Sequence, residues 1–338
     1  MHYGLDVLAV GDVVTDAFIR LGKHEAEIDK DSRDRHPLLC MTYGSKIPFE
    51  EAIIIPAVGN SANAAVASAR LGLRVGFYSN VGDDQVGKDI IRALNRHDIS
   101  TEYVHINHGM KSNYHYVLWY GADRTILIKH EDYKYAWPNI TSYNKPAWIY
   151  LSSVGEAADG LHDEIADYLV QNTDVKLAFQ PGTFQMKLGP QRLKKLYAST
   201  YLLACNLEEA QTITGQKSSN PASLIKKLHE LGPSVVVVTD GPKGSYASNG
   251  DQLWSMPIYP DPDPPLERTG AGDAYTSTFV AALARGENIP TAMAWGSINS
   301  MSVVQKVGAQ AGLLTKHEID GFMQQAPKDF CAKLEGKS

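Results

Sequence analysis

The sequence has 338 residues, of which 43% are hydrophobic and 21% are charged, and its formal net charge is -6. This composition is typical of a globular protein, and an acidic chain without clustered Lys and Arg argues against nucleic acid as a partner. Its three cysteines form no Cys-x-x-Cys pair and no run of 18 apolar residues occurs, which argues against a cysteine zinc site and a membrane span. With no signal-peptide pattern at the N-terminus, we expect a cytoplasmic protein.

Short apolar, β-branched runs recur along the chain and predict strands that are buried on both faces. In chain order they are Leu5–Val10, Arg74–Ser79, Trp148–Leu151, Val175–Phe179, Tyr201–Ala204 and Ser234–Thr239. Helical stretches lie between them, at Asn63–Leu71, Lys88–Asn95, Pro221–Leu231 and Asp273–Arg285. Strands that alternate with helices predict an α/β fold with a mostly parallel central sheet and helices on both faces.

Two segments interrupt this alternation and predict a small β-sheet appendage. Residues 18–56 are long and irregular, and the stretches 113–120 and 124–129 predict a hairpin joined by Tyr-Gly-Ala-Asp. We expect residues 18–56 and 113–133 to form a lid, over a core made of residues 1–17, 57–112 and 134–325. Residues 326–338 are expected to be a C-terminal polar tail with a short helix. The aromatic side chains Tyr114, Tyr116 and Trp119 would suit stacking on a sugar or a base.

The run Gly82–Asp89 has the glycine and lysine spacing of a Walker A phosphate loop. Its last position is a carboxylate where the motif needs a hydroxyl to bind magnesium, and Asp83 and Asp84 would repel a polyphosphate. The run therefore predicts a strand–turn–helix connection and not a phosphate loop.

The run Thr269-Gly270-Ala271-Gly272-Asp273 opens a predicted helix. Backbone N–H groups at a glycine-rich helix start are unobstructed, and with the helix dipole they form an anion site. Asp273 would lie beside that anion as a base, and phosphoryl transfer needs both elements together. The same pattern suits a carboxylate that only favours the helix dipole and glycines that only form a tight turn, so the run alone leaves both interpretations open.

Three further clusters each have a functional and a structural interpretation. Gly59–Asn63 precedes a helix, and its asparagines suit either sugar hydroxyls or helix capping. Thr239–Gly244 follows a buried strand, where α/β sheets bind ligands but where ordinary turns also occur. Asn206 and Glu209 are three residues apart and suit either hydrated magnesium near phosphates or a capping box.

Taken in order, these segments resemble the signatures of the ribokinase-like sugar kinases, also called the PfkB family. The matching segments are Gly11–Asp16, Gly59–Asn63 with Arg70–Gly72, Gly82–Gly87, Asn206–Glu209, Thr239–Gly244, Gly270–Asp273 and Val307–Gln310. The resemblance spans roughly residues 5 to 320. It implies a ribokinase-like fold and direct transfer of the γ-phosphoryl group of ATP, with Mg²⁺, to a hydroxyl of a small sugar or sugar derivative. It also implies a lid that serves as a homodimer contact.

The resemblance implies a role for each matched residue. Asp273 would be the catalytic base, and the backbone of Gly270, Ala271 and Gly272 would form the anion hole. The substrate would be bound by Asp16, Gly59, Asn60 and Asn63. The nucleotide site would be lined by Asn206, Thr239, Gly241, Gly244, Ser297 and Asn299, and Glu209 would hold the metal.

Three positions depart from the family pattern. Glu267-Arg268 stands where the second signature usually begins Asp-Thr, which leaves activation by a monovalent cation such as potassium open. Val58 replaces a glycine beside the substrate, and Gln180 begins a run where many members place an acidic or amide residue. Two alternatives to a sugar kinase stay open at this point: a nucleoside kinase, and a non-catalytic sugar- or nucleotide-binding protein on the same fold.

Overall fold

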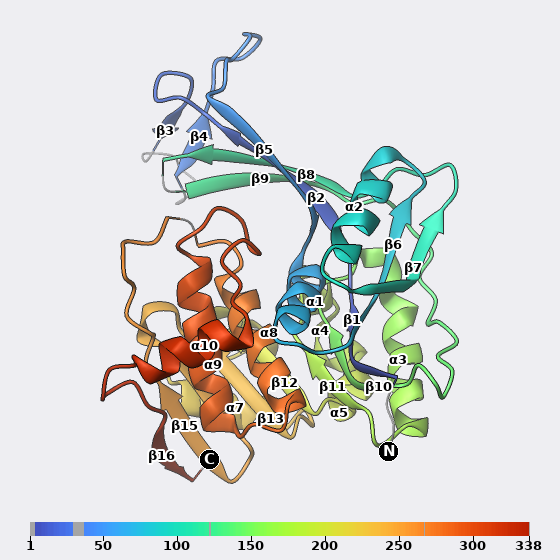
Figure 1. The fold of residues 1–338 in the computed structure, drawn as a ribbon, viewed down its shortest axis with the longest axis vertical. Coiled ribbons are helices and arrows are strands. Elements are labelled where there is room, and N and C mark those ends of the chain that lie inside the picture. Colours follow the sequence, from blue (N-terminus) through green and yellow to red (C-terminus); the bar gives the residue numbers. More distant parts are fainter. Residues whose placement is uncertain (1–3, 30–36, 122, 267, 338) are drawn as a thin grey trace.

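The main sheet runs through the centre of the molecule (Figure 1). The structure is a computed structural model that describes residues 4–29, 37–121, 123–266 and 268–337. Within these residues the main sheet has ten strands in the order β16-β15-β14-β13-β12-β11-β10-β1-β6-β7. Its parallel strands are β1 (Leu5–Val10), β6 (Val75–Gly82), β7 (Ser100–Asn107), β10 (Pro146–Leu151), β11 (Lys176–Phe179), β12 (Leu202–Asn206) and β13 (Val235–Thr239). The antiparallel strands are β14 (Ser245–Ser248), β15 (Gln252–Met256) and β16 (Lys333–Lys337).

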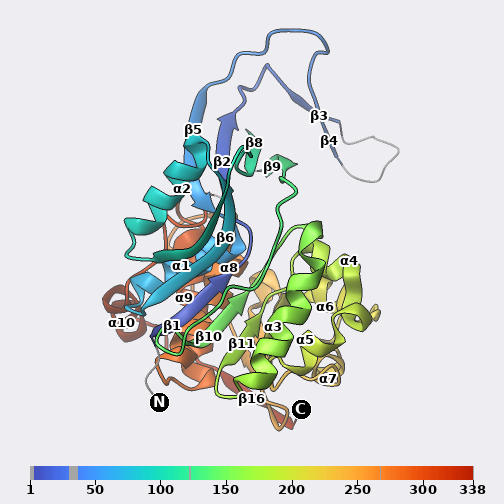
Figure 2. The same cartoon turned by 90° about the vertical axis from the view of Figure 1, so that its right-hand side faces the viewer.

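Helices cover both faces of this sheet, because neighbouring strand residues point to opposite sides and both sides are apolar. Val7 and Tyr150 pack in one layer, whereas Leu8 and Ile149 pack in the other. The first layer holds α1 (Asn60–Arg70), α2 (Gln85–Asn95), α8 (Ala271–Ala284), α9 (Ile289–Val303) and α10 (Lys316–Gln324). The second holds α3 (Asp159–Gln171), α4 (Thr183–Arg192), α5 (Lys194–Ala198), α6 (Leu207–Thr214) and α7 (Pro221–His229), as Figure 2 shows. The predicted fold class is confirmed.

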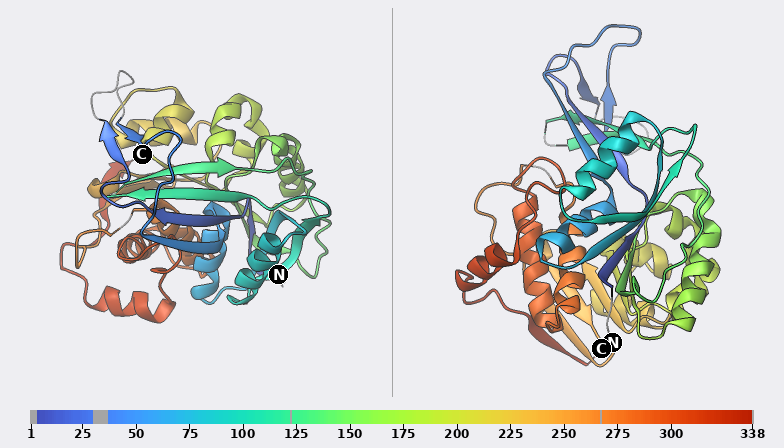
Figure 3. Two further views of the ribbon diagram at one scale, coloured as in Figure 1. Left: turned by 90° about the horizontal axis from the view of Figure 1, so that it is seen from above. Right: turned by 45° about the vertical axis from the view of Figure 1, so that its right-hand side comes forward.

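A second sheet stands over the carboxyl ends of the parallel strands (Figures 1 and 3). Its order is β5-β2-β8-β9, and we call it the lid sheet. The strands are β2 (Val14–Arg20), β5 (Glu51–Val58), β8 (Tyr114–Tyr120) and β9 (Asp123–Lys129). A separate pair, β3 (Glu27–Asp29) and β4 (Leu38–Cys40), extends beyond it. The predicted hairpin forms between β8 and β9, although Ala122 of its turn lies outside the described residues.

Strand register assigns the side chains of the lid sheet to two faces. Asp16 pairs with His115 across β2 and β8, and Trp119 pairs with Arg124 across β8 and β9. Because side chains alternate along a strand, all four lie on one face. Arg124 lines a cavity of the core, so this face is the inner one. Tyr116 is on the outer face and is exposed.

Two details differ from or refine the sequence expectations. The prediction of a short C-terminal helix is wrong, because Lys333–Lys337 forms the edge strand β16, which pairs with β15. Without β16, strand β15 would have an open edge, and its backbone groups provide the hydrogen bonds that the C-terminal segment makes. The Walker-like run is a strand–turn–helix connection as predicted, and Asp84 caps α2 by accepting from the Gly87 N–H at 2.9 Å. No helix in the described ranges is long and apolar enough to cross a membrane.

Candidate active site

The N-terminus of α8 is shaped by Gly270. This residue is the N-cap and has φ 79°, in the left-handed region. A Cβ at this position would lie 2.4 Å from the Ala309 Cβ, so glycine is required both by the backbone and by the space. The first α-helical bond returns from the Ala274 N–H to the Gly270 carbonyl at 2.8 Å. The amides just before it point out of the helix end, where an anion binds most readily.

Asp273 lies in the first turn of α8 and is held by two amide side chains. Asn63 Nδ2 donates to Oδ2 at 2.9 Å, and Gln180 Nε2 donates to Oδ1 at 3.1 Å. Burial raises the pKa of Asp273, and these two hydrogen bonds act in the opposite direction by favouring the carboxylate. Both donors come from outside α8, so the interactions of Asp273 are more than those of a helix cap.

The two amides are themselves oriented by partners. Gln310 Nε2 donates to Asn63 Oδ1 at 3.0 Å, and the buried Tyr150 hydroxyl donates to Gln180 Oε1. Because both amide oxygens are occupied, both NH₂ groups face Asp273. The chain of hydrogen bonds therefore presents Asp273 as an acceptor at a fixed position.

A cavity of about 370 Å³ opens in front of Asp273. It gathers residues that were predicted from separate motifs, namely Asn60, Asn206, Glu209, Thr239, Gly270, Gly272 and Asp273. It also contains Arg124 from the lid sheet and Gln180, which were not predicted as site residues. The cavity combines the Asp273 carboxylate, a helix N-terminus and the Arg124 guanidinium, which are groups suited to handling an anion beside a hydroxyl.

Asn206 and Glu209 form the capping box that was the structural interpretation. Asn206 Oδ1 accepts from the Glu209 N–H at 2.8 Å, and Glu209 Oε2 accepts from the Asn206 N–H at 2.9 Å. Burial raises the pKa of Glu209, and the charges of Asp273 and Glu208 add to the effect. The box fixes a carboxylate at the cavity wall, so capping and metal binding are compatible uses of the same side chain.

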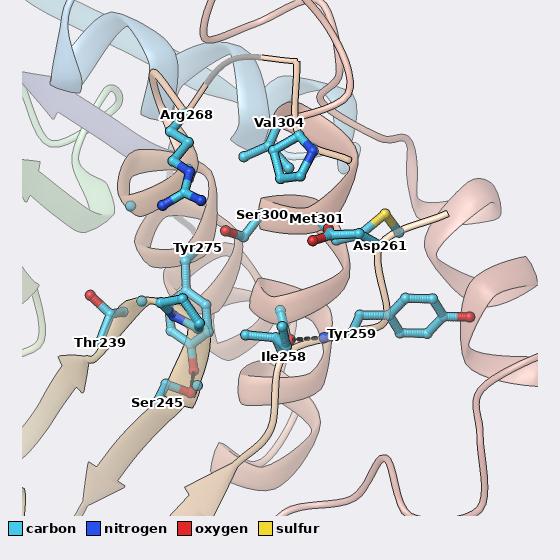
Figure 4. A pocket seen from close by; sticks show the side chains of 17 residues that line it. Thr239, Ser245, Ile258, Tyr259, Asp261, Arg268, Tyr275, Ser300, Met301 and Val304 are labelled. Carbon is cyan, nitrogen blue, oxygen red and sulfur yellow. Dashed lines mark hydrogen bonds between the residues drawn. The ribbon is translucent and has the colours of Figure 1, made fainter. Parts of the chain in front are cut away.

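A second cavity, of about 220 Å³, lies on the other side of the α8 N-terminus (Figure 4). Its lining includes the predicted residues Thr239, Gly241, Gly244, Ala271, Gly272 and Ser297. Ile258, Met301 and Val304 supply apolar walls, and Arg268 and Asp261 supply charged groups. Thr239 and Gly272 line both cavities, so the two spaces meet at the helix end.

Two residues expected near the nucleotide have structural partners. Ser297 Oγ accepts from the Tyr259 N–H at 2.8 Å and donates to the Pro257 carbonyl at 3.1 Å, which fixes the cavity wall. Asn299 is fully buried; its Nδ2 donates to Thr278 Oγ1 at 2.6 Å and its Oδ1 accepts from the Leu314 N–H at 2.9 Å. Asn299 is thus occupied in packing α9 against α8, and we do not propose it as a nucleotide ligand.

Among the expected substrate residues, Asp16 lies on strand β2 of the lid sheet, and Gly59, Asn60 and Asn63 lie at the start of α1. Gly59 is the N-cap of α1 with φ 114°, and a Cβ there would be 2.9 Å from the Asp12 carbonyl oxygen. No side-chain cap hydrogen bond occurs at α1, and Asn63 donates to Asp273, so the asparagines are not helix caps. Asp16 Oδ1 lies 3.3 Å from His115 Nδ1. The expectation about Glu267 and a monovalent cation lies outside the described residues.

Several site residues were not predicted from the sequence, because they reach the site through contacts between distant parts of the chain. Arg124 gave no clear signal, because its neighbours Asp123 and Thr125 are polar and only the strand register places it on the inner face. Gln180 was noted only as a departure from a family pattern. Tyr150 and Gln310 gave no signal, because each acts through an amide that is distant in the chain.

Comparisons with known proteins agree with the fold. The model of the pfkB family carbohydrate kinases matches residues 56–316. A ribokinase of Bacillus subtilis is 28% identical over 270 residues, which cover 78% of this chain and 87% of the ribokinase. A 5-dehydro-2-deoxygluconokinase of Listeria innocua is also 28% identical, over 301 residues that cover 82% of this chain and 90% of that protein. The structure of Arabidopsis thaliana ribokinase complexed with ribose and ATP has the same fold, with a TM-score of 0.77 at 20% identity, and the match covers 95% of this chain and 99% of that one.

Proposed function

Because this chain belongs to the pfkB family of carbohydrate kinases, we propose that it transfers the γ-phosphoryl group of ATP to a hydroxyl of a small sugar, with Asp273 as the general base. The observation that carries the proposal is the position of Asp273. It faces a cavity beside the open amides of α8, and that cavity meets a second one along Thr239 and Gly272.

The proton of the attacking hydroxyl would pass to Asp273. A base works best when its proton affinity suits the operating pH, and burial raises the pKa of Asp273 above that of an exposed carboxyl. Asn63 and Gln180 keep the group from becoming too basic by donating to the ionised form. The amides also fix which carboxylate edge can receive the proton.

Charge that develops on the transferring group would be met by the backbone N–H groups at Gly270, Ala271 and Gly272. These donors are preorganised, because the left-handed Gly270 sets the start of α8. Arg124 lies in the same cavity and would add a guanidinium from the lid sheet, the kind of group that stabilises phosphoryl transfer elsewhere.

The residues present fit a magnesium nucleotide. Glu209 offers a hard carboxylate at the cavity wall next to Asn206, and Mg²⁺ typically keeps several waters while using one or two carboxylates and phosphates. When bound, the ion neutralises phosphate charge and orients the phosphoryl group. The smaller cavity, lined by Thr239, Gly241 and Gly244, would hold the nucleoside part of ATP.

The lid aromatics are not arranged to stack on a nucleoside base, and binding of a small sugar through its hydroxyls does not require such stacking. Tyr114 and Tyr116 belong to the face opposite Asp16 and His115, by the alternation along β8. Trp119 is on the inner face but its ring is covered by Arg20, whose guanidinium carbon lies 4.9 Å from the ring centroid. These rings are therefore not placed to stack on a base bound at Asp16.

The outer face of the lid sheet supports a homodimer contact. Ile54, Tyr116 and Leu127 are 64%, 49% and 53% exposed on strands β5, β8 and β9 of this sheet, and exposed apolar groups of this kind are common at protein contacts. We expect Leu127→Asp to lower the mass measured by light scattering if the wild type is a dimer. A wild-type monomer at all concentrations would remove this part of the proposal.

The test of the base is Asp273→Asn, assayed by ADP release with ATP, Mg²⁺ and a panel of sugars. General-base loss typically lowers kcat by about 10²–10⁴-fold, and the KM for ATP should change little. Asp320→Asn, on the exposed face of α10 beside Lys316, is the matched control and should turn over normally. Turnover by Asp273→Asn equal to that of the control would show that the base is misassigned.

A further inference from the structure

The Walker-like run Gly82–Gly87 holds the segment from which lid strand β8 starts, residues 111–113, which we call the stem. Asp84 Oδ2 accepts from the Ser112 N–H at 3.0 Å, and Asp84 Oδ1 accepts from the Ser112 hydroxyl at 2.7 Å. The Ser112 hydroxyl in turn accepts from the Gly82 N–H at 3.0 Å. Because Asp84 is also the N-cap of α2, one carboxylate joins a core helix to the stem.

Both glycines of the run are required by the closeness of the stem. A Cβ on Gly82 would lie 2.3 Å from the Met110 carbonyl oxygen and 2.5 Å from the Lys111 carbonyl carbon. A Cβ on Gly87 would lie 2.2 Å from the Gly82 carbonyl oxygen and 2.9 Å from the Ser112 hydroxyl oxygen. Glycine is the residue that permits such a close approach of two backbones. The glycine spacing of the run is therefore explained by the stem, without a phosphate.

The last residue of the stem, Asn113, is bonded to both neighbouring parts of the lid sheet. It is 1% exposed; its Nδ2 donates to the Val13 carbonyl at 3.4 Å, and its own carbonyl accepts from the Thr15 N–H at 3.3 Å. Its Oδ1 accepts from the Glu131 N–H at 2.8 Å, which ties the segment after β9 to the same point. The stem thus fixes where β8 begins against β2 and where the β8–β9 hairpin returns to the core.

Arg124 lies far along this hairpin from the stem. It pairs with Trp119 across β8 and β9, and it lines the cavity in front of Asp273. Trp119 is seven residues beyond Ser112, which at about 3.3 Å per residue is about 23 Å of strand. A tilt of about 5° at the stem would therefore move the Arg124 end of the hairpin by about 2 Å. A misplacement of only about 1 Å can lower a rate by about 100-fold.

We infer that Asp84 is a positioning residue for phosphoryl transfer, because the stem that it holds sets where the inner face of the lid sheet places Arg124 and Asp16. This inference rests on the proposed kinase function and gives the Gly82–Gly87 run a part in it. Asp84 is not a catalytic residue, since its two oxygens accept from Gly87 and Ser112. Its effect through Arg124 belongs to kcat, and its effect through Asp16 belongs to the KM for the sugar.

The first experiment compares the kinetics of Asp84→Ser with those of Asn220→Ser, a change at the N-cap of α7. Serine is as good an N-cap as aspartate or asparagine, but its side chain is one atom shorter and has one oxygen, so it cannot also hold Ser112. We expect Asp84→Ser to lower kcat by about 10- to 100-fold and to raise the sugar KM by at least about tenfold. The KM for ATP should match the control, because the described residues that line the nucleotide cavity lie at or after Thr239.

This pattern separates positioning from a loss of folded protein. A folding defect lowers the active fraction, and with it kcat, but leaves both KM values unchanged. A sugar KM of Asp84→Ser equal to that of Asn220→Ser would therefore overturn the inference while the kinase function stands. If the wild type phosphorylates no sugar, the proposed function itself fails.

The second experiment tests whether Asp84 acts on kcat through Arg124. In the double variant Asp84→Ser/Arg124→Gln the two kcat losses should not multiply, because a misplaced guanidinium and a missing one have the same consequence. The double variant should therefore have the kcat of Arg124→Gln within about threefold. Losses that multiply would overturn the link between the two residues.

A third measurement, hydrogen exchange of the lid amides, does not depend on turnover. Peptides that span residues 111–133 should exchange faster in Asp84→Ser than in Asn220→Ser, since the stem is released. Equal exchange would overturn the anchoring whether or not a sugar is phosphorylated. If Asp84→Ser does not fold, Tyr133→Phe tests the same stem, because it removes only the bond from the Tyr133 hydroxyl to the Lys111 carbonyl at 2.6 Å. It should also raise the sugar KM, and a wild-type value is the contrary result.

Discussion

Gln180 controls the proton affinity of the proposed base, and this can be tested by removing its donor group. Gln180 donates to Asp273 at 3.1 Å and accepts from the Tyr150 hydroxyl. Replacing Gln180 alone would leave the buried Tyr150 hydroxyl without a partner, which adds a separate destabilisation. We therefore compare Tyr150→Phe with the double variant Tyr150→Phe/Gln180→Met, so that the two proteins differ only in the donor to Asp273.

The size of the effect follows from the type of hydrogen bond. A hydrogen bond to a charged group contributes about 1.5–3 kcal/mol, and it stabilises only the ionised form of Asp273. Its loss raises the pKa of Asp273 further in the direction already set by burial. At acidic pH the ionised fraction should then fall by about 10- to 100-fold, since about 1.4 kcal/mol is a factor of ten.

The assay is kcat as a function of pH, measured by ADP release for both proteins. The base must be ionised to accept a proton, so activity is lost as pH falls through the pKa of Asp273. The acid limb of the double variant should lie at higher pH than that of Tyr150→Phe, and both should reach the same plateau at alkaline pH. Superimposed acid limbs would refute the reasoning, and a lower plateau with an unmoved limb would show a packing effect instead.

The remaining predictions concern the anion hole, the metal and the lid sheet. Gly270→Ala should lower the free energy of unfolding by at least about 1–2 kcal/mol, because Gly270 has a left-handed backbone. Gly272→Ala has open space at its Cβ, so it should lower kcat but not the melting temperature. Equal melting temperatures of the two variants would contradict this prediction. Glu209→Gln should raise the Mg²⁺ concentration needed for half-maximal rate, and an unchanged Mg²⁺ titration would remove Glu209 from the metal site. Arg124→Gln should lower kcat by about 10²–10³-fold. The control is Arg20→Gln, which changes another arginine of the lid sheet, paired with Glu50, and should leave kcat unchanged. Equal losses of kcat in the two variants would indicate a general effect on the lid sheet.

The sequence was sufficient for the elements whose signal is local. Six buried strands were predicted from apolar, β-branched runs such as Ser234–Thr239, which forms β13 (Val235–Thr239), because strands of a parallel sheet are apolar on both faces and need no context to be recognised. The glycine-rich start of α8 was visible for the same reason, since Gly270 satisfies a backbone requirement within its own turn. The order of these motifs along the chain is by itself enough to indicate the family.

The sequence was less informative where an element depends on its neighbours. The C-terminal segment forms strand β16 and not a helix, because the open edge of β15 offers it hydrogen bonds that the local sequence does not record. The spacing of Asn206 and Glu209 predicts both a capping box and a metal site. It cannot distinguish the two, because the geometry of the capping box also leaves the Glu209 carboxylate at the cavity wall.

Only the tertiary structure decided which side chains meet at the site. Asn63 and Asp273 are 210 residues apart in the chain, and Gln180 and Asp273 are 93 apart, yet all three converge because the carboxyl ends of parallel strands and the start of α8 share one edge of the sheet. The contact between His115 and His130 likewise depends on the lid sheet folding back over Asp12. Local patterns specify backbone conformation, whereas hydrogen bonds between distant side chains form only once packing has fixed both ends.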